Sequence, residues 1–151
     1  MDASPARAHD APPSAPQLAQ LQSMLTGTLC ERMGMRLISL GAESGVMTMP
    51  VEGNTQPAGL LHGGASIALA ESIASFCGIA HARALHGDRA QGVGTHVTAV
   101  HHRSARAGTV TATCSAVKLG RTLSTYEVRI TDDDDALLCT ATVSVMARPP
   151  R

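Results

Sequence analysis

A glutamate lies in the middle of a long apolar segment that two glycines open. The segment begins at Gly63 and Gly64 and continues past Glu71 to about Ala84, and no cation lies within one helical turn of Glu71. Charged side chains are almost never fully buried without a partner, so Glu71 is either a structural acid with a distant partner or a reactive group. An apolar environment makes a carboxylate a stronger base, and backbone amides at a helix start can hold a developing negative charge. The glycines therefore favour the reactive carboxylate.

Gly63 is suited to stabilise the negative charge that develops when a carboxylate reacts. Because glycine lacks a Cβ, a carbonyl oxygen can approach its amide closely, and the helix dipole adds partial positive charge there. When water or a carboxylate attacks a carbonyl carbon, an oxyanion forms that must be stabilised. Removing one oxyanion donor typically costs a factor of ~10²–10³ in rate. Taken alone, the two glycines could equally be a tight turn into the helix.

Several other functions lack their sequence signals. The chain has no HExxH, GxSxG, P-loop or GxGxxG motif, so a metal site, a serine hydrolase and a nucleotide fold are all disfavoured. The formal net charge is zero, and Phe76 and Tyr126 are the only aromatic residues, which argues against nucleic acid and anionic membranes as partners. No apolar run reaches the ~18 residues that a membrane span needs.

The four cysteines point to a reducing compartment. Cys30, Cys77, Cys114 and Cys139 form no CxxC motif, and residues 1–16 contain no apolar secretory region. We therefore expect a cytoplasmic protein in which cysteines act as small hydrophobic side chains.

The apolar pattern predicts a single α+β domain behind a flexible tail. Residues 1–16 are rich in alanine, proline and serine and form the expected tail, and residues 17–151 form the domain. The expected elements are a short helix ending at Gly27, strands at 35–40 and 45–51, a long helix at 64–84, and strands at 92–103, 109–118, 122–131 and 137–147. The long helix is apolar nearly all round, so it should be buried against a mostly antiparallel sheet.

This order and the central motif resemble the hot-dog fold, in which an antiparallel sheet wraps a long helix. The matching stretches are Gly59-Leu-Leu-His-Gly-Gly-Ala-Ser66, Leu69-Ala-Glu-Ser-Ile73, His102-Arg-Ser-Ala105 and Leu119-Gly-Arg121. They are similar to the acyl-CoA thioesterases of the 4-hydroxybenzoyl-CoA type found in Arthrobacter. The nearest likeness is to the branch that cleaves 1,4-dihydroxy-2-naphthoyl-CoA or proofreads aryl carrier proteins. The resemblance covers residues 17–147.

The resemblance implies roles for particular residues. Glu71 would be the nucleophile or general base, and the Gly63 amide would polarise the thioester carbonyl. Gln56 and His62 would help to hold the thioester and water, and Ser75 supplies the hydroxyl one turn after the carboxylate. The coenzyme A contacts would lie at Gly120, Arg121 and Thr122. Apart from the resemblance, Arg103 could also meet the phosphates of coenzyme A, because arginine–phosphate contacts are strong. No metal or prosthetic group is implied.

Each of these residues also has a simpler interpretation. His62 could cap the helix, Ser75 could be an ordinary helix serine, and the arginines could be solvated surface residues. Thr98 and Val100 stand where some relatives carry asparagines, a departure that would alter the acyl pocket. The functional interpretation rests on the spacing of His62, Gly63, Glu71 and Ser75 taken together.

The predicted activity is hydrolysis of acyl-CoA thioesters, with aromatic or hydroxyaromatic acyl groups favoured. The alternatives are a proofreading thioesterase acting on an aryl or acyl carrier protein, and a non-catalytic acyl-CoA binding protein. Gly63 and Glu71 are eight positions apart, or ~12 Å along a helix, which is too far for one chain to complete the site. We therefore expect a homodimer with shared sites, and the resemblance implies pairing of dimers into a homotetramer.

Overall fold

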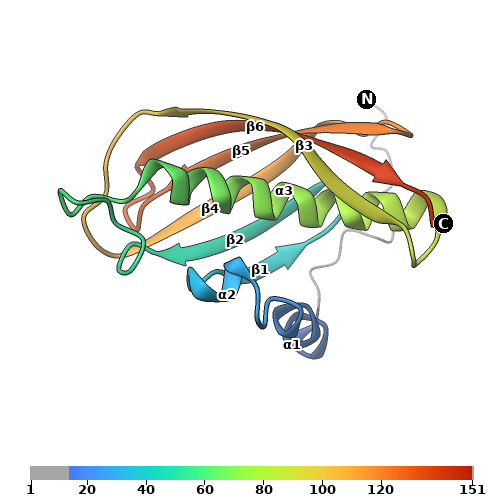
Figure 1. The fold of residues 1–151 in the computed structure, drawn as a ribbon, viewed down its shortest axis with the longest axis horizontal. Helices are drawn as coiled ribbons and strands as arrows, with labels where there is room; N and C mark the ends of the chain where they lie inside the picture. The colour runs from blue at the N-terminus through green and yellow to red at the C-terminus, as the bar shows by residue number, and fades with distance from the viewer. Residues whose placement is uncertain (1–13, 151) are drawn as a thin grey trace, which may run out of the picture.

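A six-stranded antiparallel sheet curves around one long helix in the computed structural model, which describes residues 14–150 (Figure 1). The strand order in the sheet is β1-β2-β4-β5-β6-β3. The elements in chain order are α1 (Ala15–Ser23), α2 (Leu29–Arg32), β1 (Arg36–Leu40), β2 (Ser44–Pro50), α3 (Gly63–His86), β3 (Gln91–His101), β4 (Thr109–Lys118), β5 (Leu123–Thr131) and β6 (Leu137–Arg148). The predicted α+β architecture is confirmed.

The core forms where one side of α3 meets the concave face of the sheet. Leu69, Ile73 and Cys77 recur every four residues along α3 and are fully buried, and Met47 and Met49 reach them from alternate positions of β2. Fully burying a leucine or isoleucine side chain stabilises the fold by ~1.5–3 kcal/mol. Helix α3 has the length and mean hydropathy of a membrane span, but here its buried side forms this core.

The N-terminal region differs from the sequence expectation. Helix α1 begins at Ala15, two residues before the expected boundary, because the Gln17 side chain accepts a 2.8 Å hydrogen bond from the Ser14 amide and closes the first turn. It ends at Ser23 rather than near Gly27, and the four-residue α2 follows. A helix this short carries no periodic signal in sequence. The first 13 residues of the expected tail lie outside the described part of the chain.

The edge strand β3 lies alongside α3 and contains a β-bulge. Gly94 pairs with Val145, but the next paired residue is His96, opposite Ser144, so Thr95 is extra. The bulge shifts the alternation by one, so Val97 and Ala99 pack against the core beyond it.

Candidate active site

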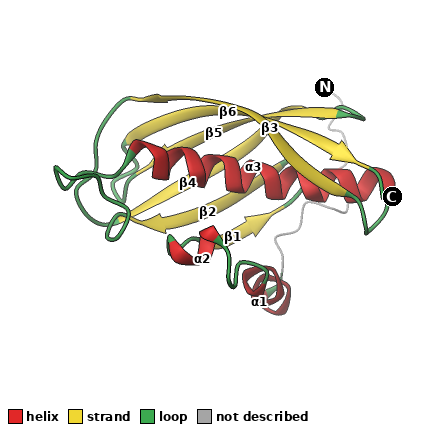
Figure 2. Ribbon diagram, viewed as in Figure 1, coloured by secondary structure: helices red, strands yellow, loops and turns green. Residues whose placement is uncertain are grey.

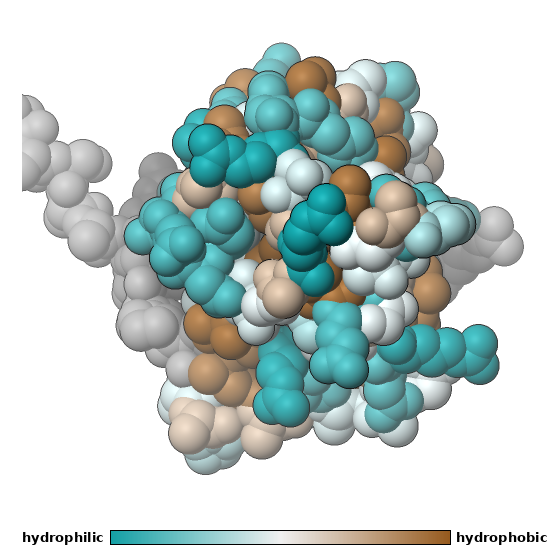
Figure 3. Space-filling model, turned by 90° about the vertical axis from the view of Figure 1, so that its left-hand side faces the viewer, coloured by the Kyte–Doolittle hydropathy of each residue, from teal (hydrophilic) through white to brown (hydrophobic). Residues whose placement is uncertain are grey.

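A cleft opens at the end of the molecule where α3 begins. The loops of residues 51–62 and 102–108 meet at this end (Figure 2). The cleft has a volume of about 400 Å³, and its lining includes Gln56, Gly63, Ser66, His101, Arg103 and Leu138. Figure 3 views this end of the molecule and shows hydrophilic side chains around smaller apolar areas. Three residues predicted from sequence, Gln56, Gly63 and Arg103, therefore share one cleft.

The loop before α3 is held by its own backbone and by Asn54. The Asn54 side-chain amide donates to the carbonyls of Met33 and Pro50 at 2.8 and 2.9 Å, and the Asn54 carbonyl accepts from the amide of His62 at 2.9 Å. The Gln56 side chain accepts a 2.6 Å bond from the Ala58 amide. The loop therefore fixes Gln56 at the rim of the cleft.

Gly63 presents a free amide at the first turn of α3. His62 is the N-cap, and its Nδ1 accepts a 2.8 Å hydrogen bond from the Gly64 amide. Within residues 14–150, the Gly63 amide has no acceptor of its own. The first amides of a helix have no intrahelical partner, and their dipoles favour negative charge. The site can therefore stabilise an oxyanion, while His62 acts as a cap in this chain.

His101 is a member of the cleft that the sequence did not single out for this site. It ends β3, and its imidazole packs directly on the backbone of Gly63, where an added Cβ would lie 3.0 Å from Nε2. Nothing in the local spacing of the sequence connects His101 to a glycine 38 positions earlier. The pairing of β3 beside α3 creates that contact.

Glu71 lies two turns further along α3, outside the cleft. Its carboxylate is half-buried, and Oε1 accepts a 2.8 Å hydrogen bond from the Ser75 hydroxyl. Ile67 and Ile79, one turn before Glu71 and two turns after it, are also half-buried, so the four residues form a partly exposed stripe on α3. Gly94 of β3 lies against the Glu71 carboxylate. The structure brings Glu71 and Ser75 together, but not with Gly63.

The residues expected to meet coenzyme A fall into two groups. Arg103 lines the cleft beside Gly63. The turn containing Gly120 and Arg121 instead packs on the other half of α3, where His81 Nε2 lies 2.9 Å from the Gly120 carbonyl. The Thr122 carbonyl accepts a 2.8 Å bond from the Ala147 amide, which fixes the end of this turn.

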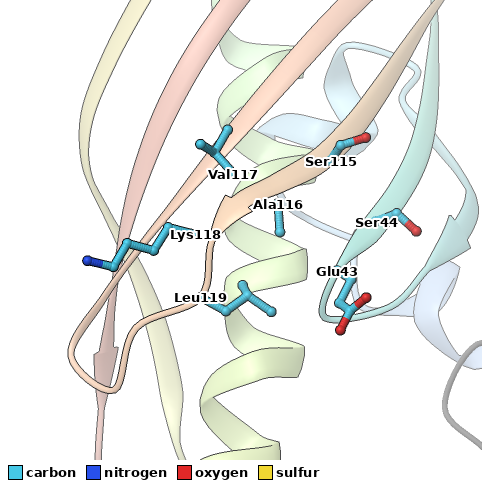
Figure 4. Close-up of a pocket in the computed structure, with 7 residues that line it drawn as sticks. All are labelled: Glu43, Ser44, Ser115, Ala116, Val117, Lys118 and Leu119. Atoms are coloured by element: carbon cyan, nitrogen blue, oxygen red, sulfur yellow. The ribbon is translucent and has the colours of Figure 1, made fainter. Parts of the chain in front are cut away.

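A second hollow, of about 530 Å³, lies beside this turn (Figure 4). It is lined by residues at the start of β2 and the end of β4, including Glu43, Ser44 and Leu119. The Lys118 side chain extends away from the Glu43 carboxylate. Its two charged lining residues, Glu43 and Lys118, therefore do not point toward each other.

The thiol and phenol groups with strongly shifted pKa values belong to the core. Burial raises the pKa of Tyr126, whose hydroxyl donates a 3.1 Å bond to the Ala42 carbonyl. A hydrogen bond with Cys77, together with burial, raises the pKa of the Cys114 thiol. Within residues 14–150, no group of three His, Cys, Asp or Glu side chains is placed to hold a metal ion.

Comparison with known proteins connects this architecture to an activity. Residues 58–139 match the family model described as the thioesterase superfamily. The chain is 40% identical over 128 residues to the proofreading thioesterase EntH of Cronobacter turicensis, covering 84% of this chain and 90% of the relative. It is 37% identical over 125 residues to 1,4-dihydroxy-2-naphthoyl-CoA hydrolase of Escherichia coli, covering 82% and 89%.

A solved structure agrees with these relatives. The crystal structure of a mutant of thioesterase PA1618 from Pseudomonas aeruginosa matches with a TM-score of 0.82 at 34% identity, covering 91% of this chain and 97% of that one. The fold is therefore that of the hot-dog thioester hydrolases. The chain belongs to the thioesterase superfamily, and the sequence-based prediction of a thioesterase is confirmed.

Proposed function

We propose that this thioesterase hydrolyses coenzyme A thioesters of aromatic or hydroxyaromatic acids, with Glu71 as nucleophile or general base. The observation that carries the proposal is the half-buried Glu71 carboxylate, held by Ser75 on the central helix. The Gly63 amide would bind the carbonyl oxygen as negative charge develops on it, and the products would be the free acid and the thiol of coenzyme A. One of the relatives, the E. coli enzyme, is named for an aromatic coenzyme A thioester.

We propose further that two chains build each site. Gly63 and Glu71 lie ~12 Å apart along α3, so one thioester carbonyl cannot meet both groups in the same chain. The partly exposed stripe of Ile67, Glu71, Ser75 and Ile79 lies next to the edge strand β3, and a second copy packed there would cover apolar surface. An antiparallel pair of α3 helices would bring Gly63 of one copy beside Glu71 of the other.

The same arrangement accounts for the two separate groups of coenzyme A contacts. If Gly63 faces Glu71 of the second copy, the loop before Gly63 lies beside the half of that copy's α3 on which Gly120 and Arg121 pack. Arg103 from one chain and Arg121 from the other would then border one substrate. Arginine forms strong, often bidentate contacts with phosphate, which suits the nucleotide end of coenzyme A.

A second substrate class has support from the comparisons. The relative from Cronobacter turicensis is named as a proofreading thioesterase, so an acyl or aryl carrier protein is the alternative carrier of the thioester. Both carriers present the acyl group on the same kind of thiol arm. The reaction at Glu71 and Gly63 would be unchanged, whereas the contacts of Arg103 and Arg121 would differ.

A thiol-release assay tests the substrate class. Aromatic, hydroxyaromatic, short, medium and long acyl-CoAs are compared with an aryl-loaded carrier protein under the same conditions. The proposal expects the highest kcat/KM for the aromatic coenzyme A thioesters. A clear preference for aliphatic chains would contradict the acyl group, a preference for the loaded carrier would favour proofreading, and binding without turnover would contradict catalysis.

A further inference from the structure

The edge strand β3 carries two glycines, Gly92 and Gly94, that both approach α3 but meet different parts of it. A Cβ built on Gly92 would lie 2.7 Å from the backbone of Gly78 and Ile79. A Cβ built on Gly94 would instead overlap Glu71 Oε1, and it would lie 3.3 Å from Ser75 Oγ. One glycine therefore makes room for the helix backbone, and the other makes room for the carboxylate.

We propose that Gly94 is a positioning residue for the reaction, because its missing Cβ leaves the space in which Ser75 holds the Glu71 carboxylate. This proposal rests on the catalytic role proposed for Glu71. The Thr95 bulge follows Gly94 immediately, so the strand changes its pairing at the point where it passes the carboxylate. Bulges occur often next to active sites, where they change the direction in which a strand presents its residues.

The two glycines should differ in what their replacement costs. The Glu71 carboxylate is the end of a flexible side chain, and it can rotate away from a methyl group at position 94 with little loss of stability. That rotation would move the reacting oxygen and break its 2.8 Å bond with Ser75. A displacement of ~1 Å at a reacting group can cost up to ~10²-fold in rate. At position 92 the obstacle is backbone, so a methyl group there must strain the packing of β3 on α3.

The test compares Gly94→Ala with Gly92→Ala and Gly41→Ala. Gly41 is the neutral control, because its added Cβ would make an ordinary 3.4 Å contact with the Ser44 carbonyl. For Gly94→Ala we expect kcat to fall by about tenfold or more while KM changes by less than about threefold, with a melting temperature near that of wild type. Gly92→Ala should instead lower the melting temperature. Loss of stability without loss of kcat in Gly94→Ala would overturn the proposal.

A rescue experiment asks whether the effect acts through the carboxylate. Glu71→Asp shortens the side chain by one methylene and vacates the space that the new methyl group would take. Gly94→Ala should therefore reduce kcat by a much smaller factor in the Glu71→Asp background than in wild type. An equal factor in both backgrounds would overturn the proposal.

A measurement without substrate separates this proposal from the proposed function. The ¹³C signal of the Glu71 carboxyl carbon, assigned through its loss in Glu71→Gln, reports the surroundings of the carboxylate in the unliganded protein. Gly94→Ala should shift this signal, whereas Gly41→Ala should not. An unshifted signal would overturn the placement of Gly94. Full activity of Glu71→Ala would instead refute the catalytic role of Glu71. The shift of the Glu71 carboxyl signal in Gly94→Ala would then still support the placement of Gly94.

Discussion

Replacing Ser75 by alanine removes the hydrogen bond that holds the Glu71 carboxylate. The bond is 2.8 Å long and joins a neutral hydroxyl to Oε1. Hydrogen bonds to charged groups contribute ~1.5–3 kcal/mol, and the lower end applies because both residues are half-buried. Since ~1.4 kcal/mol corresponds to a factor of ten in rate, Ser75→Ala should lower kcat by about tenfold.

The assay is thiol release from an aromatic coenzyme A thioester, with kcat and KM measured separately. KM should change little, because the hydroxyl would act on the carboxylate that we propose to react, rather than on the bound acyl group or nucleotide. Ser72→Ala is the matched control. It lies on the same helix, and its hydroxyl accepts a 3.5 Å contact from Cys30 Sγ instead of reaching Glu71. The control should keep wild-type kcat.

Two results would refute this reasoning. If Ser75→Ala keeps wild-type kcat, the hydroxyl does not hold the carboxylate in the reactive position. If Ser75→Ala and Ser72→Ala lose activity equally and both melt at lower temperature, the loss reflects helix packing.

Three further predictions concern phosphate recognition, assembly and pH. Arg121→Ala should raise KM for a coenzyme A thioester with little effect on an N-acetylcysteamine thioester, and equal losses on both would place Arg121 in structural support. Co-expressed Glu71→Ala and Gln56→Ala chains should restore about a quarter of all sites, because each mixed dimer holds one site with neither lesion. Verified mixed dimers with no activity above that of the two parent proteins would exclude shared sites. Burial raises the pKa of Tyr126, so above about pH 10 the unfolded chain loses a proton that the folded chain keeps, and stability falls as pH rises. The melting temperature of Tyr126→Phe should therefore fall less than that of wild type between about pH 9 and pH 11, and parallel curves would contradict this origin.

The sequence predicts most of the fold because its signals are local. Alternating valine and threonine place four strands within two residues of their observed ends. The apolar run predicts a helix at 64–84, within two residues of the ends of α3 at Gly63–His86. Helix α2 is the exception, because four residues at Leu29–Arg32 carry no period. The boundary of α1 also differs, since it depends on the contact between Ser14 and Gln17 rather than on hydrophobicity.

The site is less accessible from sequence because its contacts are long-range. The pair of Glu71 and Ser75 follows from helical spacing and could be inferred. The contacts of His101 with Gly63 and of Gly94 with Glu71 arise only when β3 lies along α3, and the bulge at Thr95 changes which residues face the helix. Alternation counted along the sequence cannot reveal that shift.

The separation of Gly63 from the carboxylate is a further consequence of helix geometry. A rise of 1.5 Å per residue fixes their spacing at ~12 Å, whatever the surrounding packing. If Gly63 and Glu71 act on the same thioester as proposed, a second chain must supply one of the two groups. The half-buried stripe around Glu71 and the edge position of β3 favour the second chain.

The most direct test of the central claim is the turnover of Glu71→Ala on the best thioester substrate, measured beside its melting temperature. The account predicts that hydrolysis falls by about 10²–10⁴-fold while the protein melts close to wild type, because Glu71 is half-buried and its hydrogen-bond partner is on its own helix. Turnover within about tenfold of wild type, or a large fall in melting temperature with high residual turnover, would contradict it.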